Sequence, residues 1–169
     1  SDGKLRVLFL DYTMKSQAIK EDGVFANLTF KIKSSAADDT VASISKLGSA
    51  TFGDKDLNRL SVVIIDGSVK VGDSTTPVTP TPTPSTGTTP TPVTTEFSFI
   101  IGNVTGKAGT EVAVPLSVVN VPSIGITTTD MAISYDSDIL EYVSYEAGSI
   151  VTNAATNLEI NKESDGKLR

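Results

Sequence analysis

The 169-residue sequence predicts an all-β sandwich that is interrupted by an extended linker. Short runs with apolar side chains at every second position recur between turn residues about every 8–12 residues, a spacing typical of sandwiches. No segment shows a sustained helical period. The central stretch 74–95 carries six of the eight prolines, eleven threonines and no charge. Because proline fixes φ and lacks an N–H, this stretch predicts a solvated, semi-rigid spacer, with O-linked sugars on its threonines left open.

Each predicted strand is a short alternating run bounded by Gly, Asp or other polar residues. Pro115 lies inside one run, which indicates an edge strand or a bulge. The Gly-rich run 48–57 is predicted to be a loop, and the last strand of the first half is broken at Asp66-Gly67. In chain order the predicted strands cover 4–11, 24–33, 41–47, 60–65 with 67–71, 96–101, 111–119, 126–135 and 139–146, and 150–160 is the last ordered segment.

The hexapeptide SDGKLR occurs at 1–6 and again at 164–169, 163 residues later. The repeat predicts a window cut from a tandem array of near-identical modules, or alternatively a circular permutant. Residues 1–73 are then the C-terminal half of a module, 74–95 the linker and 96–169 the N-terminal half of a module. Neither half can bury a core alone. Because a Pro-rich linker resists doubling back, we expect the front half of one chain to complete the back half of the next.

The composition excludes several classes of function. The chain has no Cys, His or Trp, which removes disulfides, Ser-His-Asp catalysis, His-ligated zinc and the commonest aromatic platform for sugars. A net charge of −6 argues against nucleic acid and anionic membranes as partners. No run is long and apolar enough for a transmembrane helix. The Thr/Pro linker favours a secreted, extracellular protein.

Acidic residues raise two further hypotheses, a metal site and an enzyme. Asp136-Ser137-Asp138 and the run 53–56 resemble fragments of calcium loops, but neither extends to a full ligand set, so turn chemistry is the favoured interpretation. Asp11, Asp130 and Glu159 could serve glycoside hydrolysis, which needs two paired carboxylates. The sequence gives no pairing signal, and an enzyme is not predicted.

One strand face is unusually apolar for a solvated surface. Arg6, Leu8 and Leu10 alternate on the supposed outer side of the first strand, and the run 127–130, Thr-Thr-Thr-Asp, is polar. An apolar centre with a polar rim is typical of a protein-binding surface. A strand buried on both faces is the alternative, and the residues alone favour neither.

In module order the chain reads GNVTGKAGTEVAVPLSV, GITTTDMAISYDSDILEYVSYEAG, GKLRVLFLDYT, EDGVFANLTFKIK, ATFGD and DGSVKVGD. This series resembles a type I cohesin module of a cellulosomal scaffoldin over essentially all of both halves. The resemblance implies a nine-stranded jelly-roll β-sandwich that is not an enzyme. It also implies binding, through one sheet face, to the dockerins of secreted glycoside hydrolases that degrade plant cell walls.

The resemblance also implies which residues bind the dockerin. The family's key strand acid falls on Asp130, and Thr128 stands where some members have Asn, a departure that bears on partner specificity. Calcium is expected on the dockerin and no cofactor on this chain, and neighbouring cohesins of the same scaffoldin are expected beside it. A carbohydrate-binding or adhesion sandwich is the alternative. The full set of predicted dockerin-binding residues is Arg6, Leu8, Leu10, Asp11, Thr13, Thr128, Asp130, Asn157 and Glu159.

Overall fold

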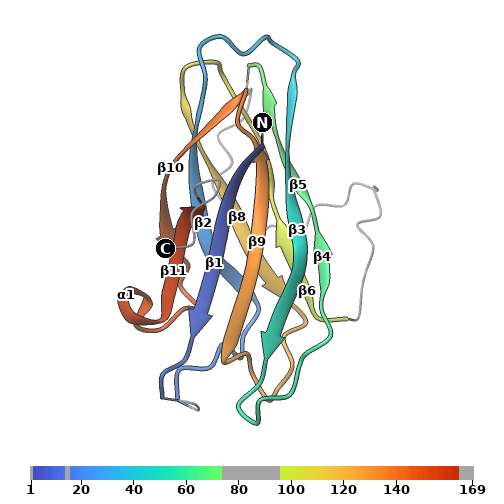
Figure 1. Ribbon diagram of the computed structural model, residues 1–169, viewed down its shortest axis with the longest axis vertical. Coiled ribbons are helices and arrows are strands. Elements are labelled where there is room, and N and C mark those ends of the chain that lie inside the picture. Colours follow the sequence, from blue (N-terminus) through green and yellow to red (C-terminus); the bar gives the residue numbers. More distant parts are fainter. Residues whose placement is uncertain (1, 14–15, 74–95, 164–169) are drawn as a thin grey trace, which may run out of the picture.

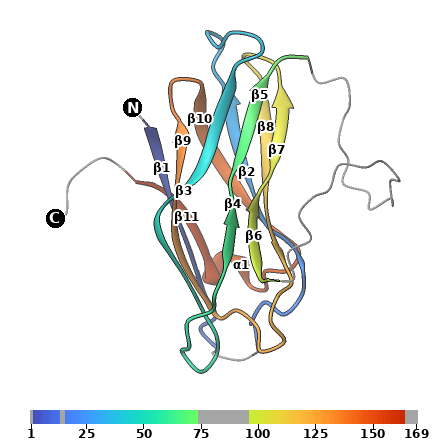
Figure 2. The same ribbon diagram turned by 90° about the vertical axis from the view of Figure 1, so that its right-hand side faces the viewer.

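The computed structural model describes residues 2–13, 16–73 and 96–163, and it confirms an all-β sandwich. Two sheets pack face to face (Figures 1 and 2). The predicted linker and the second hexapeptide lie outside the described residues. The six-stranded sheet has the spatial order β11 (Leu158–Glu163), β1 (Asp2–Leu10), β9 (Thr128–Asp136), β3 (Val41–Gly53), β5 (Gly67–Val71) and β7 (Asn103–Gly106). The five-stranded sheet has the order β10 (Leu140–Ala147), β2 (Gly23–Ile32), β8 (Glu111–Val119), β6 (Ser98–Ile101) and β4 (Val63–Ile65).

Two chain segments pass from one sheet to the other with only one residue between the strands. A single residue, Asp66, separates β4 from β5, and Gly102 separates β6 from β7. A Cβ at Gly67 would lie 2.3 Å from the carbonyl oxygen of Gly102, so the crossing requires glycine. If β4 with β5, and β6 with β7, are each counted as one strand that changes sheets, the eleven described strands become the nine that the family resemblance implies.

The two halves of the chain fold into one sandwich, so the predicted exchange of halves between chains is wrong. β1 lies between β9 and β11 of the other half, and β2 lies between β8 and β10. β4 and β5 pair in parallel with β6 and β7. The prediction failed because it gave linker stiffness too much weight. A 22-residue linker at about 3.1 Å per residue reaches about 68 Å, more than the length of any strand here.

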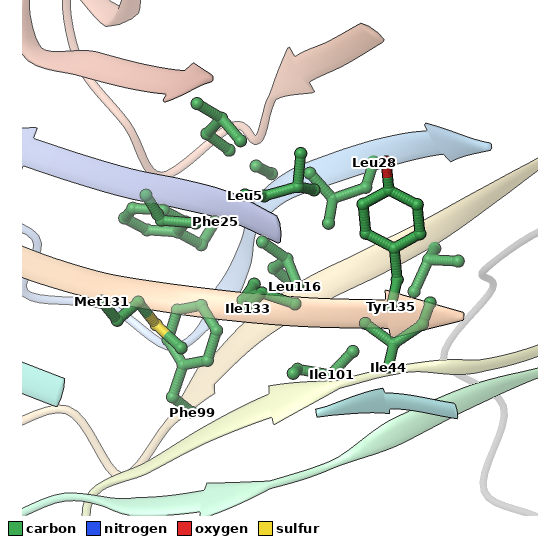
Figure 3. Packing of buried hydrophobic residues seen from close by; sticks show 14 of the residues in the cluster. Leu5, Phe25, Leu28, Ile44, Phe99, Ile101, Leu116, Met131, Ile133 and Tyr135 are labelled. Atoms are coloured by element: carbon green, nitrogen blue, oxygen red, sulfur yellow. The ribbon is translucent and has the colours of Figure 1, made fainter. Parts of the chain in front are cut away.

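The core lies between the sheets and draws on both halves. On β1 the buried side chains of Leu5, Val7 and Phe9 alternate with outward ones. Phe9 meets Phe25 edge-on with ring centroids 6.0 Å apart, and Phe25 meets Phe99 at 5.7 Å. Such aromatic pairs add to the burial energy. Figure 3 shows side chains from both sheets meeting in this core, among them Leu5, Phe25, Leu28, Phe99, Leu116, Met131 and Ile133.

Strand β3 is longer than the sequence predicted. It continues through the expected loop 48–57 as far as Gly53, with a register shift between Leu47 and Thr51. Gly48 within this irregularity has φ +66°. The Gly-rich, polar composition therefore marks an irregular strand rather than a loop, and this strand brings Thr51 to the surface discussed below.

Pro115 does not lie in an edge strand, but a register shift between Val24 and Ala26 lies close to it in the β2–β8 pair, as the alternative prediction of a bulge would have it. Pro115 itself lies in β8 between β2 and β6, opposite Asn27 in regular register. Its carbonyl oxygen accepts a hydrogen bond from the N–H of Gly102 at 2.8 Å. In an antiparallel ladder the N–H and C=O of one residue point the same way. The missing N–H of Pro115 thus faces Gly102, the residue just after the end of β6.

Two short elements were not predicted. β7 lies between the predicted strands 96–101 and 111–119. Helix α1 (Ala154–Asn157) interrupts the segment 150–160 just before β11. Across the described ranges, α1 is the one helix, and at four residues it is far too short to cross a membrane.

Candidate binding face of the six-stranded sheet

The outer face of the six-stranded sheet forms a regular grid of side chains. Leu8 of β1 lies opposite Glu159 on β11 and opposite Asp130 on β9. Asp130 in turn lies opposite Thr51 on β3. One row toward the end of β1, Leu10 lies opposite Thr128. The antiparallel register thus gathers residues that are far apart in sequence around the end of β1.

A shallow hollow of about 290 Å³ opens on this part of the face. It lies where β1 and β3 end and β9 begins, at the lower end of the sandwich in Figure 1. Most of the predicted dockerin-binding residues line it. The lining consists of Leu8, Phe9, Leu10, Tyr12, Thr51, Thr128, Thr129, Asp130, Thr156, Asn157 and Glu159.

Leu8 and Leu10 belong to the surface and not to the core. Leu10 is 37% exposed, and Leu8 is half-buried at the centre of the grid. Phe9, between them, points the other way and is buried. Of the two sequence interpretations, the structure therefore supports an outward apolar patch on a well-packed strand. Such a patch can be covered by a partner without rearrangement of the fold.

Asp130 is held by Arg6 from the neighbouring strand. The guanidinium Nε and Nη2 donate to the two carboxylate oxygens at 3.1 and 2.8 Å, a bidentate arrangement. Both side chains remain about half exposed. The hydrogen bond to Asp130, followed by its charge, raises the pKa of Arg6. Arg6 and Asp130 therefore form one polar unit beside the hollow.

Asp11 is buried, although the family resemblance makes it a contact residue. Its carboxylate accepts hydrogen bonds from the Thr13 N–H at 2.8 Å, the Thr13 hydroxyl at 2.5 Å and the Gln17 N–H at 3.2 Å. Its own N–H donates to the Thr127 carbonyl at 2.8 Å. Asp11 and Thr13 thus shape the loop after β1. The same loop leaves Tyr12 66% exposed at the rim of the hollow.

Asn157 and Glu159 lie on the opposite rim. The Nδ2 of Asn157 donates to the Gln17 side-chain oxygen at 2.6 Å and to the Thr152 carbonyl at 2.9 Å, and the residue is buried. These bonds tie α1 to the loop that Asp11 organises. Glu159 is exposed and accepts a hydrogen bond from Asn161. Of these two, Glu159 is the side chain that a partner can reach directly.

The loop after β3, which the sequence interpretation did not connect with the site, lies at the same end of the sandwich as the end of β1 (Figure 1). Asp54 is buried there and accepts hydrogen bonds from the N–H groups of Asp56 and Asn58 and from the Asn58 side chain. Burial raises the pKa of Asp54, but these hydrogen bonds outweigh it, so the net shift is downward. Leu57 stands 75% exposed at the tip with φ 63°. The sequence signal that could have drawn attention to this loop is Leu57, an isolated apolar residue among polar loop residues.

Thr129 lies beneath the hollow with its side chain toward the core. It is opposite Phe9 on one side and Phe52 on the other. Its buried hydroxyl has no hydrogen-bond partner among the described residues. An unpaired buried hydroxyl is destabilising.

The acidic runs that faintly resembled calcium loops serve as turns. Asp54 accepts from Asp56, and Asp136 accepts from the Asp138 N–H at 3.0 Å. The turn interpretation is confirmed. Within residues 2–13, 16–73 and 96–163, no three acidic side chains converge on one point as a metal-binding group.

Comparison with known proteins places this chain in a family. The model of the cohesin domain family matches residues 1–71 and 97–169. The chain is 33% identical over 158 residues to "Cellulose-binding protein A" of Clostridium cellulovorans, covering 93% of this chain and 8% of that protein. It is 37% identical to "Cellulosomal-scaffolding protein A" of Acetivibrio thermocellus, over 80% of this chain and 7% of that protein.

A third relative is "Cellulosomal-scaffolding protein B" of Acetivibrio thermocellus, 38% identical over 80% of this chain and 16% of that protein. The chain spans less than a fifth of the length of each of these three relatives. No solved structure matched it. The family match covers nearly all of both halves and leaves out the Thr/Pro segment. The chain therefore belongs to the cohesin domain family, a family of structural modules without catalytic activity.

Proposed function

We propose that this chain is a scaffoldin cohesin that binds a dockerin module through the hollow around Leu8. The observation that carries the proposal is the outward patch of Leu8 and Leu10, which is flanked by Asp130, Thr128 and Glu159 on a fully paired sheet. An apolar centre with a hydrogen-bonding rim on a rigid scaffold is what a specific protein interface needs. Relatives named for cellulosomal scaffolding support this assignment.

The dockerin would belong to a secreted glycoside hydrolase of the plant-cell-wall-degrading kind. Calcium would sit on the dockerin, and the cohesin would need no metal for the contact. The Thr/Pro segment 74–95 would tether neighbouring modules, so that several enzymes act at high effective concentration on one polysaccharide outside the cell. The family assignment concerns this chain alone, whereas the proposed partners and location concern the whole scaffoldin.

Isothermal titration calorimetry with type I dockerins of cellulosomal enzymes tests the proposal. We expect calcium-dependent binding that a chelator abolishes. Asp130→Ala should cost about 1.5–3 kcal/mol of binding free energy, the range for a hydrogen bond to a charged group, with the fold intact. Glu141→Ala is the matched control, because Glu141 is an exposed acid opposite Lys31 on the other sheet. Equal affinities for wild type and Asp130→Ala would remove Asp130 from the site.

A carbohydrate-binding face is the second candidate, favoured by one observation. Tyr12 is 66% exposed at the rim of the hollow and could stack on a sugar ring. Affinity electrophoresis in gels containing cellulose or xylan separates the two candidates. We expect no retardation of the module, and retardation that Tyr12→Ala removes would support sugar binding instead.

A further inference from the structure

Asp130, the acid opposite Leu8 on the proposed face, is paired with Arg6. Arg6 spans both oxygens of Asp130 with Nε and Nη2, at 3.1 and 2.8 Å. Arg6 lies opposite Ala132, a small residue, and its guanidinium reaches diagonally along the strand to Asp130. The side chains are 49% and 50% exposed. Any partner that covers Asp130 therefore also covers the guanidinium.

The guanidinium keeps donors that this pairing does not use. A guanidinium has five N–H groups in a fixed plane, and the fork to Asp130 uses two of them. The other three point away from Asp130, and no hydrogen bond within the described part of the chain occupies them. In the free protein water satisfies these N–H groups, because the side chain is half exposed.

Covering Arg6 without an acceptor would be costly. Buried N–H groups of a charged side chain that lose water and gain no partner weaken an interface strongly. A cation at this point of the partner would be repelled, and an apolar group would leave the donors unpaired. A carboxylate matches both the charge and the planar fork of a guanidinium. A partner with a cation, an apolar group or a carboxylate at this point would therefore bind with different affinities, and these differences are large enough to discriminate between partners.

The position of Arg6 relative to Leu8 fixes where the partner's acid must be. Residues two apart on a strand share a face and lie about 7 Å from each other. Leu8 is the apolar centre of the face, and Arg6 is the next outward residue on β1. A side chain that packs on Leu8 must therefore have an acid about 7 Å away along the direction of β1.

We propose that Arg6 is a specificity-determining residue of this face. It selects dockerins that carry a carboxylate about 7 Å from the side chain seated on Leu8, and it rejects those with a cation or an apolar group there. The inference rests on the proposed dockerin binding and names the partner chemistry that this particular cohesin requires. Asp130 then serves two purposes, because it orients the guanidinium and accepts from the partner.

The experiment is calorimetric titration of a panel of type I dockerins of cellulosomal enzymes, with calcium present. Arg6→Gln should weaken the tightest complex about tenfold to a hundredfold, as expected for lost hydrogen bonds to a charged group. Arg6→Lys keeps the charge without the fork and should recover part of the loss. Lys4→Gln is the matched control, since it removes one positive charge from the same face of β1, one row farther from Leu8. It should change the affinity less than about threefold.

A double-mutant cycle then tests the partner's acid. The surface Asp and Glu residues of the bound dockerin are changed singly to Asn and Gln. One change should weaken binding to the wild-type chain as strongly as Arg6→Gln does, and should have little further effect on the Arg6→Gln variant. Wild-type affinity or tighter binding by Arg6→Gln, or a cycle in which no dockerin acid couples to Arg6, would overturn the inference and leave dockerin binding standing. If the wild-type chain binds no dockerin in the panel, the proposed function itself fails and the inference with it.

Discussion

Asp11→Ala should both destabilise the fold and weaken dockerin binding, because Asp11 builds the loop that walls the hollow. Its buried carboxylate accepts three hydrogen bonds, two from Thr13 and one from Gln17. Thr13 is exposed, so water can replace the carboxylate at its two donors at modest cost. We therefore assign a loss of about 1.5 kcal/mol of unfolding free energy to the two Thr13 hydrogen bonds together, and about 1 kcal/mol to the hydrogen bond from the Gln17 N–H.

The sum predicts a loss of about 2–3 kcal/mol in the free energy of unfolding, or a fall of roughly 5–10 °C in melting temperature for a domain of this size. Urea unfolding followed by circular dichroism measures the first quantity, and calorimetric titration with a dockerin measures binding. Asp130→Ala is the informative comparison, because it should weaken binding while stability stays nearly unchanged. Unaltered stability of Asp11→Ala together with a large loss of binding would refute the reasoning, since Asp11 would then be a direct contact.

Three further changes test other parts of the structure. Thr129→Val removes a buried, unpaired hydroxyl and should raise the free energy of unfolding by about 1 kcal/mol, measured in urea; a loss of stability would show that the hydroxyl has a partner. Leu10→Ser should weaken dockerin binding with little change in melting temperature, whereas a core residue would cost roughly 2–5 kcal/mol of stability on truncation. Burial, with smaller contributions from the charges of Tyr145 and Tyr135, raises the pKa of Tyr142 to about 12. The contribution of its neutral form to stability is complete below about pH 10, the pKa in the unfolded chain, and is lost as the pH rises through the folded pKa. Wild type should therefore lose stability relative to Tyr142→Phe above pH 10, and parallel curves would contradict this.

Alternation of apolar residues was sufficient to predict the sandwich and most of its strands. It works because one face of each strand must enter the core, as Leu5, Val7 and Phe9 do on β1. It failed at β3, where a register shift carries the strand through a polar, Gly-rich stretch. An irregular strand keeps its hydrogen-bonded neighbours but loses the apolar alternation at every second residue. Because that alternation is the strand signal in a single sequence, this part of β3 was missed.

The sequence predicted which residues belong to the candidate site better than it predicted what each of them does. Alternation alone puts Leu8 and Leu10 on the face of β1 opposite Leu5, Val7 and Phe9, but it leaves open whether that face is exposed or buried. The burial of Asp11 and Asn157 does not follow from alternation, because it depends on contacts between Gln17 and α1 across 140 residues of chain. The pairing of Arg6 with Asp130 likewise depends on the β1–β9 register. Long-range register is decided by the packing of the whole sandwich, which local pattern does not contain.

The central claim is that a dockerin covers the outer face of the six-stranded sheet around Leu8. Backbone amide spectra of the ¹⁵N-labelled protein, recorded while a calcium-loaded type I dockerin is added, test it most directly. We predict that the shifts cluster on the ends of β1 and β9, including Leu8, Leu10, Thr128 and Asp130, and on Glu159 of β11. The outward residues Thr29, Ala113 and Ser117 of the five-stranded sheet should stay unchanged. Shifts that cluster on β2 and β8 while the surroundings of Leu8 remain unperturbed would contradict the account.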